Sequence, residues 1–305
     1  MNIQWYPGHM TKARRAMKED MKLIDLVIEL VDARVPFSSR NPDIDELAAG
    51  KARMVLLNKA DLADEAKNAA WAALFESRGI HVAKIDARNK GSLKQVQAVI
   101  QEACKEKIER DRRRGILNRP IRTMVVGIPN VGKSTFINSF AGKACAKTGN
   151  KPGVTKGNQW IRLNKTLELL DTPGILWPRF EDQTVGLHLA LIGSINDQIL
   201  NREELAWELI GLLEQIYPGV LTERYGDAAE GETEDNSAWK ELSKEEQNLK
   251  ASRMLERIAK NRACLMKGGE LDLARASALL LDEFRSGKLG KLSLEQAPAY
   301  TDRVK

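Results

Sequence analysis

The strongest constraint on the fold of this chain is an eight-residue string, Gly127–Ser134, which has the form G-x-x-x-x-G-K-S. It follows an apolar run at 123–126 that is typical of a strand, and it opens a helical pattern at 133–140. Glycines in such a string let backbone N–H groups close around phosphates, and the helix N-terminus adds a positive dipole end. The string therefore predicts a phosphate-binding loop between a strand and a helix.

The surrounding pattern alternates strands with helices. Further buried strands are predicted at 26–31, 54–57 and 82–85, and helices at 63–77 and 93–113. Such alternation predicts an α/β domain with a mostly parallel sheet and helices on both faces. Two apolar runs at 161–163 and 167–170 flank Asn164-Lys165-Thr166, which predicts a hairpin that adds an antiparallel edge.

Helical periodicity replaces the strand signals after about residue 180. Helices are predicted at 203–216, 244–266 and 271–285, and the polar stretch 227–236 has the composition of a loop. We therefore expect an α/β domain at 1–180, a small all-α domain at 181–286, and a short extended tail at 287–305.

Several residues of the α/β domain are suited to phosphate and metal chemistry. Lys133 can neutralise β- and γ-phosphate charge, and the Ser134 hydroxyl can bind Mg²⁺. Asp171 ends an apolar strand in D-T-P-G, where its carboxylate can hold Mg²⁺ through water and the Gly174 N–H can meet a γ-phosphate. A loop threonine can complete the Mg²⁺ site, and Thr155 is favoured over Thr148 because it stands in a Pro-Gly-x-Thr context.

A second set of residues predicts which base is bound. Residues 58–61 form N-K-x-D, in which the Asp61 carboxylate can accept hydrogen bonds from guanine N1–H and N2–H₂. Lys59 can cover the base, and Asn58 can tie this loop to the phosphate loop. The run 86–88, Asp-Ala-Arg, is similar to the S-A-K/R loop whose alanine N–H meets guanine O6, with Asp86 in the usual place of serine.

The guanine motif comes before the phosphate loop, the reverse of the order in an ordinary small GTPase, yet each motif still ends its own strand. A circular permutation of the same sheet explains this order. In full, the predicted nucleotide-binding residues are Asn58, Lys59, Asp61, Asp86, Ala87, Arg88, Pro129, Asn130, Val131, Gly132, Lys133, Ser134, Thr135, Thr155 and Gly174. The predicted Mg²⁺ ligands are Ser134, Thr155 and Asp171.

This motif order, with Asp32–Pro36, Ser39–Pro42 and the opening Trp5–Ala13, resembles the ribosome biogenesis GTPase A (YlqF/RbgA) family of circularly permuted GTPases. The similarity runs from residue 3 to about residue 290. The resemblance implies a cytoplasmic GTPase that uses GTP/GDP and Mg²⁺ in late assembly of the large (50S) ribosomal subunit. It also implies a helical C-terminal domain that contacts rRNA.

The residue that would position the attacking water is not settled by the motifs. Ile175 stands where small GTPases often carry glutamine, and isoleucine can neither donate nor accept a hydrogen bond. The resemblance implies His9 as the catalytic residue; alternatively, His9 caps the first helix or contacts RNA. Asn130 stands at a phosphate-loop position that helps bind K⁺ in a subset of GTPases.

Composition favours a nucleic-acid partner over a membrane. The net charge is +6 with a pI of about 9.1, and neither a lipidation motif, a signal peptide nor a long apolar run is found in the sequence. Three separated cysteines fit a reducing cytoplasm. Candidate RNA-binding residues form three basic groups: Lys250, Arg253, Arg257, Lys260 and Lys267; Arg110, Arg112, Arg113 and Arg114; and Lys12, Arg14, Arg15 and Lys18.

Two alternatives stay open at this stage. The chain can be a GTP-regulated RNA-binding assembly factor with negligible intrinsic hydrolysis, or a GTPase that serves another RNA process. The oligomeric state is not readable from the residues.

Overall fold

The structure of the protein is a computed structural model that describes residues 15, 17–117, 119–142, 159–172, 182–197, 200–226 and 239–302. The chain forms two compact units. One unit runs to Leu189 and resumes at Glu295, and the other spans Ala190–Leu294. No helix among the described residues is long and apolar enough to cross a membrane.

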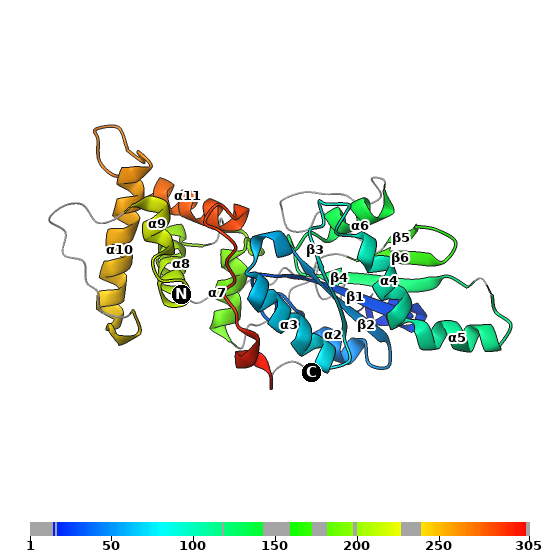
Figure 1. The fold of residues 1–305 in the computed structure, drawn as a ribbon. Helices are drawn as coiled ribbons and strands as arrows, with labels where there is room; N and C mark the ends of the chain where they lie inside the picture. The colour runs from blue at the N-terminus through cyan, green and yellow to red at the C-terminus, as the bar shows by residue number, and fades with distance from the viewer. Residues whose placement is uncertain are drawn as a thin grey trace. The chain divides into compact units, whose positions relative to one another are not determined.

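The first unit is built on one six-stranded sheet with the order β3-β2-β1-β4-β6-β5 (Figure 1). Its strands are β1 (Leu26–Asp32), β2 (Ala52–Asn58), β3 (His81–Ile85), β4 (Ile121–Gly127), β5 (Gln159–Arg162) and β6 (Leu167–Asp171). Neighbouring strands are parallel except β5, which pairs antiparallel with β6. The predicted parallel sheet and its antiparallel edge hairpin are confirmed.

Burial explains why the central strands could be predicted. All seven residues of β1 are buried, because the strand lies inside the sheet and is covered on both faces. The edge strand β5 buries only Ile161 of its four residues. Continuous apolar runs therefore mark the centre of the sheet, and a weaker pattern marks its edge.

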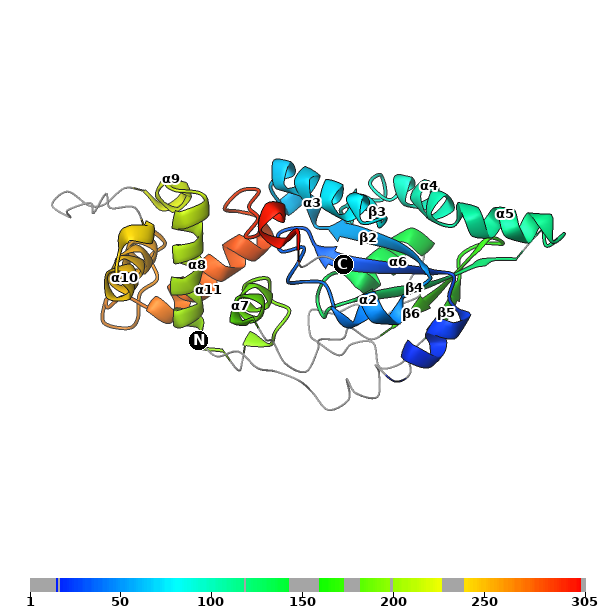
Figure 2. The ribbon, with the colours of Figure 1, turned by 90° about the horizontal axis from the view of Figure 1, so that it is seen from below.

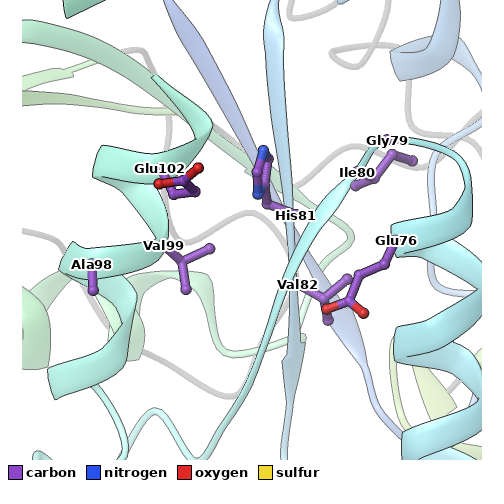
Figure 3. Close-up of a pocket in the computed structure, with 8 residues that line it drawn as sticks. All are labelled: Glu76, Gly79, Ile80, His81, Val82, Ala98, Val99 and Glu102. Carbon is purple, nitrogen blue, oxygen red and sulfur yellow. The ribbon is translucent and has the colours of Figure 1, made fainter. Parts of the chain in front are cut away.

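The helices of this unit are α2 (Asp43–Leu47), α3 (Glu65–Ser77), α4 (Lys94–Ala103), α5 (Lys105–Arg113) and α6 (Lys133–Ala141), with short 3₁₀ turns at Met21–Leu23, Ala60–Leu62 and Ala297–Tyr300. Helix α7 (Gln183–Leu191) contains the boundary at Leu189 where the chain leaves the unit. Helices α3 and α4 lie on either side of β3 (Figure 3). The single helix predicted at 93–113 is wrong: it breaks at Cys104, which is buried and has a non-helical backbone.

The second unit is helical. It contains α8 (Arg202–Ile216), α9 (Val220–Tyr225), α10 (Lys244–Asn261), α11 (Leu273–Ser286) and a 3₁₀ turn at Trp239–Glu241. Helices α8, α10 and α11 contact one another (Figure 2) around buried Leu209, Leu255 and Leu280. The helix predicted at 244–266 ends early at Asn261, because Ala263 adopts a positive φ of 48° that no α-helix accommodates.

A short extended tail is expected at 287–305, and the last described residues of this range pack against the first unit. Ala297 belongs to a buried apolar cluster with Val31, Trp71 and Phe75 of the first unit. The Tyr300 ring stacks on Phe37, with the ring centroids 4.5 Å apart. Apolar side chains in this segment thus complete the core beside α3, and the compact units have bounds different from those of the expected domains.

A buried polar cluster joins three distant segments of the first unit. His188 Nδ1 lies 3.0 Å from Glu295 Oε1 and 3.1 Å from Ser38 Oγ. Glu295 also accepts hydrogen bonds from the Ser38 hydroxyl and from the backbone N–H groups of Phe37 and Ser38. His188 and Glu295 stand next to the two points at which the chain crosses between the units.

Candidate nucleotide-binding site

The phosphate loop has the backbone that its sequence predicts. It leaves β4 at Gly127, passes through Asn130 and Gly132 with φ values of 60° and 96°, and enters α6 at Lys133. A Cβ on Gly127 would lie 2.9 Å from Leu30 O, and one on Gly132 would clash with Asn58 Nδ2. Only glycine fits at these two positions, so the loop keeps its N–H groups available to phosphate oxygens.

Lys133 and Asp171 meet in the described site. Lys133 Nζ donates to Asp171 Oδ1 at 2.7 Å and to the Thr172 carbonyl. Burial lowers the pKa of Lys133, against the opposing charge of Asp171. Ser134 follows Lys133 in the first turn of α6, so the sequence supplies a hydroxyl next to the lysine that pairs with the Asp171 carboxylate. These hard oxygen donors fit Mg²⁺, which binds through one or two protein groups plus substrate phosphates.

Asn58 joins the guanine motif to both neighbouring loops. Its Nδ2 donates to Val131 O of the phosphate loop at 2.7 Å. Its Oδ1 accepts from Ala87 N of the 86–88 loop at 2.9 Å. Asn58 is 2% exposed, and both the oxygen and the nitrogen of its buried amide are hydrogen-bonded. The amide therefore holds the phosphate loop and the 86–88 loop in place. Three motifs that are distant in sequence are thereby held at one edge of the sheet.

Lys59 is held by Asp32, a residue that the nucleotide-binding motifs do not include. Its backbone is left-handed with φ 59°, and its Nζ donates to Asp32 Oδ2 at 2.8 Å and to Asn130 O at 3.2 Å. Burial alone would raise the pKa of Asp32, but Arg34 and Lys59 outweigh it and hold the pKa below its usual value. Asp32 lies opposite Asn58 in the sheet, and this register is the signal that could have identified it.

Asp61 carries the carboxylate predicted to read guanine, and it is paired. Arg88 Nη2 donates to Asp61 Oδ2 at 2.6 Å, and Arg88 Nε donates to Asp86 Oδ1 at 2.9 Å. Hydrogen bonding to Asp86 raises the pKa of Arg88, although partial burial acts against it. The described guanine loop is therefore a cluster of two carboxylates around one guanidinium.

The predicted nucleotide-site residues fall partly inside and partly outside the described ranges. His9, Thr155, Gly174 and Ile175 lie outside the described residues. Pro129, Asn130, Val131 and Thr135 lie in the phosphate loop and the first turn of α6, as its sequence implies. Within the described ranges, no group of three or more His, Cys, Asp or Glu side chains forms a metal site.

A separate hollow of about 520 Å³ lies beside the edge strand β3 (Figure 3). Glu76 of α3, His81 of β3 and Glu102 of α4 contribute its polar groups. His81 and Val82 begin β3, whereas the 86–88 loop follows its end at Ile85. The hollow is thus at the amino end of the strand, away from the nucleotide motifs.

Comparison with known proteins agrees with this geometry. A model of the 50S ribosome-binding GTPase family matches residues 122–212, from β4 into α8. Ribosome biogenesis GTPase A from Bacillus cereus is 47% identical over 304 residues, covering 100% of this chain and 97% of the relative. The chain belongs to the ribosome biogenesis GTPase A family.

More distant members and solved structures fit the same family. Ribosome biogenesis GTPase A from Thermotoga maritima is 31% identical and covers 98% of this chain and 96% of its own. The GDP-bound structure of TM YlqF has a TM-score of 0.64 and 26% identity, and covers 93% of this chain and 100% of its own. A crystal structure of GNP-bound YlqF from T. maritima has a TM-score of 0.59. These comparisons confirm the predicted fold class, the GTPase activity and the binding of a guanine nucleotide.

Proposed function

We propose that this protein hydrolyses GTP as a switch in late assembly of the large ribosomal subunit, in the cytoplasm, and contacts rRNA through its helical unit. The observation that carries the proposal is the Asn58 side chain, which holds the guanine motif against the phosphate loop and the 86–88 loop. The names of the full-length relatives supply the ribosomal setting.

Each placed residue has a role toward the nucleotide. The phosphate-loop N–H groups and the positive end of α6 bind the phosphates. Lys133, which pairs with Asp171 in the structure, exchanges that partner for the phosphates. Asp61 reads the guanine edge, Ala87 N–H stands beside the position of O6, and Lys59 covers the base. Adenine leaves these groups unmatched, which explains the choice of GTP.

Ser134, Thr155 and Asp171 would hold Mg²⁺, Asp171 through water. The bound metal would supply positive charge beside the β- and γ-phosphates. Asn130 would bind K⁺ at the phosphates, where another cation such as an arginine finger acts in related chemistry. Equal hydrolysis rates in Na⁺ and K⁺ buffers would refute the role of Asn130.

His9 is proposed to orient the attacking water, because Ile175 cannot. An imidazole near neutral pH can exchange a hydrogen bond with water. We expect His9→Ala to bind GTP as the wild-type protein does and to lose stimulated turnover. Unchanged stimulated turnover would assign His9 to helix capping or RNA contact instead.

The basic residues of α10 divide into two pairs. Arg253 and Lys260 are exposed, whereas Lys250 and Arg257 are half-buried. Burial raises the pKa of Glu214 of α8, and the charges of Lys250 and Arg257 oppose that rise. Lys267 lies beyond the helix end. Arg253 and Lys260, with the exposed arginines at 110 and 112–114 and with Arg15 and Lys18, supply positive charge for a phosphate backbone. Lys12 and Arg14 lie outside the described residues.

The deciding experiment measures GTP hydrolysis with and without purified large ribosomal subunits, in K⁺ buffer with Mg²⁺. We expect stimulation of at least about tenfold, because completing a phosphoryl-transfer site changes kcat by orders of magnitude. Binding of GTP without stimulation would favour the alternative, a GTP-regulated assembly factor with negligible hydrolysis. Stimulation by another RNA instead would place the GTPase in a different RNA process.

A further inference from the structure

The 86–88 loop contains a charge arrangement that the general GTPase motif does not require. Asp86 replaces the serine of the S-A-K/R pattern, so a second carboxylate stands next to the guanine-reading Asp61. Arg88 bridges the two: its Nη2 lies 2.6 Å from Asp61 Oδ2 and 3.3 Å from Asp86 Oδ2. Its Nε and backbone N each lie 2.9 Å from Asp86 Oδ1.

The backbone keeps Asp86 in this position. Asp86 N donates to Ser92 Oγ at 3.1 Å, and the same hydroxyl donates to Asp86 O at 2.7 Å. The next residue, Ala87, donates to Asn58 Oδ1 at 2.9 Å. These bonds hold the backbone of Asp86 and Ala87 in place, and the Asp86 carboxylate itself is bonded to Arg88, the residue that also pairs with Asp61. The charges of the two carboxylates are therefore balanced by one arginine.

The guanidinium of Arg88 can pair with both carboxylates at the same time. A guanidinium offers a rigid fork of N–H donors, which suits two carboxylates better than the point charge of lysine. An ionised carboxylate has about four lone-pair sites, so Asp61 can keep its bond to Arg88 and still accept from guanine N1–H and N2–H₂. The bond from Arg88 then fixes the rotation of the Asp61 carboxylate.

We propose that Arg88 is a positioning residue for guanine recognition, which neutralises Asp86 and orients the Asp61 carboxylate toward the base. The proposal rests on the proposed function, since it concerns the same nucleotide site. It makes Asp86 and Arg88 a coupled pair: the arginine is needed because the aspartate is present.

The test is a double-mutant cycle read out by GDP affinity. We expect Arg88→Ala to weaken binding of a fluorescent GDP analogue by ~10- to 100-fold, the range for losing a charged hydrogen bond. Asp86→Ser in the same chain should restore most of that affinity, because it removes the repelling charge and supplies a hydroxyl. Arg162→Ala is the matched control: it removes an exposed arginine opposite Glu168, at the far end of β6 from Asp171.

A second readout separates positioning from folding. Inosine diphosphate lacks the 2-amino group, so the preference for GDP over inosine diphosphate should fall in Arg88→Ala and return in the double variant. Unchanged GDP affinity in Arg88→Ala, or a double variant as weak as Arg88→Ala alone, would overturn the proposal. If instead the wild-type chain fails to prefer GDP over ADP, the proposed function itself fails.

Discussion

Among single residues, Gly132 and Asn58 show how closely the phosphate loop and the guanine loop are packed. The Asn58 amide occupies the space that a side chain at position 132 would need. At the same time Gly132 has φ 96°, a left-handed conformation that residues with a Cβ rarely adopt. Both facts make this one backbone position decisive for nucleotide binding.

We expect Gly132→Ala to weaken GDP binding by at least ~10-fold, because backbone strain of 1–3 kcal/mol and the clash with Asn58 both displace the loop. Calorimetric titration with GDP measures this. Gly79→Ala is the control, since Gly79 also has a positive φ of 72° but no neighbour within 4 Å of an added Cβ. Equal GDP affinity in the two variants would show that the Asn58 contact has no role.

The proposed role of the Asp61 carboxylate predicts how a variant chooses between guanine and xanthine nucleotides. We expect Asp61→Asn to lose ~10- to 100-fold or more in GTP affinity, because an amide presents a donor to a guanine donor and leaves polar groups unpaired. Xanthosine triphosphate has a carbonyl in place of the 2-amino group, so it should bind the variant better than GTP does. Competition between the two nucleotides checks the order, and retained GTP preference would remove Asp61 from base recognition.

Among elements, the strands were predictable and the helix ends were not. Mostly apolar runs such as Leu26–Val31 predict a strand that is buried on both faces of a sheet. The break at Cys104 interrupts a pattern whose helical periodicity continues on both sides, so only the tertiary position of that buried residue reveals it. The early end of α10 likewise depends on the pairing of Leu265 with Leu271, a contact that local sequence does not specify.

The helical unit contains a polar cluster centred on Glu283 of α11. Glu283 Oε2 accepts from Arg224 Nε at 2.9 Å and from Tyr225 Oη at 3.0 Å, and Arg262 lies 3.3 Å from Oε1. Burial alone would raise the pKa of Glu283, but these hydrogen bonds and charges outweigh it and lower the pKa. The cluster joins α9, α11 and the end of α10.

A pH dependence follows from the direction of that shift. Because the folded pKa is below the ordinary value of 4.5, the stabilisation is present above about pH 4.5 and is lost as pH falls through the folded pKa. We expect Glu283→Gln to cost about 1–3 kcal/mol at pH 7 and much less at pH 3. Urea unfolding followed by helical circular dichroism at both pH values checks this, and an equal loss at both would exclude a charge effect.

In the whole molecule, the motifs predict that their residues lie near one another, but not how those residues pair. The proximity of Asn58, Lys133 and Asp171 follows from the strand ends of a parallel sheet, which meet at one edge, and the roles of these residues stay predictions. The bond from Lys59 to Asp32 and the bond from Arg88 to Asp61 could not be predicted, because they depend on strand register and on side-chain reach. His9 and Thr155 stay predictions.

The C-terminal segment should matter to the stability of the whole GTPase unit. Tyr300 stacks on Phe37 and lies 5.6 Å from the Trp71 ring centroid. We expect Tyr300→Ala to lower the free energy of unfolding of this unit by ~1–3 kcal/mol, through lost aromatic contacts and burial. Urea unfolding followed by intrinsic tryptophan fluorescence, compared with Tyr300→Phe as the control, measures the change. An unaltered midpoint would mean that the segment packs without stabilising the unit.

The His188–Glu295 contact has a consequence for modular architecture. The side chains of two residues more than a hundred positions apart in sequence are in contact, His188 Nδ1 lying 3.0 Å from Glu295 Oε1, so Ala190–Leu294 has the form of a domain insertion whose two ends are near each other. A short Gly/Ser linker from Leu189 to Glu295 should therefore close the GTPase unit on itself without stretching the sheet. By the same reasoning, a different module could replace the helical one while the nucleotide-binding unit stays intact.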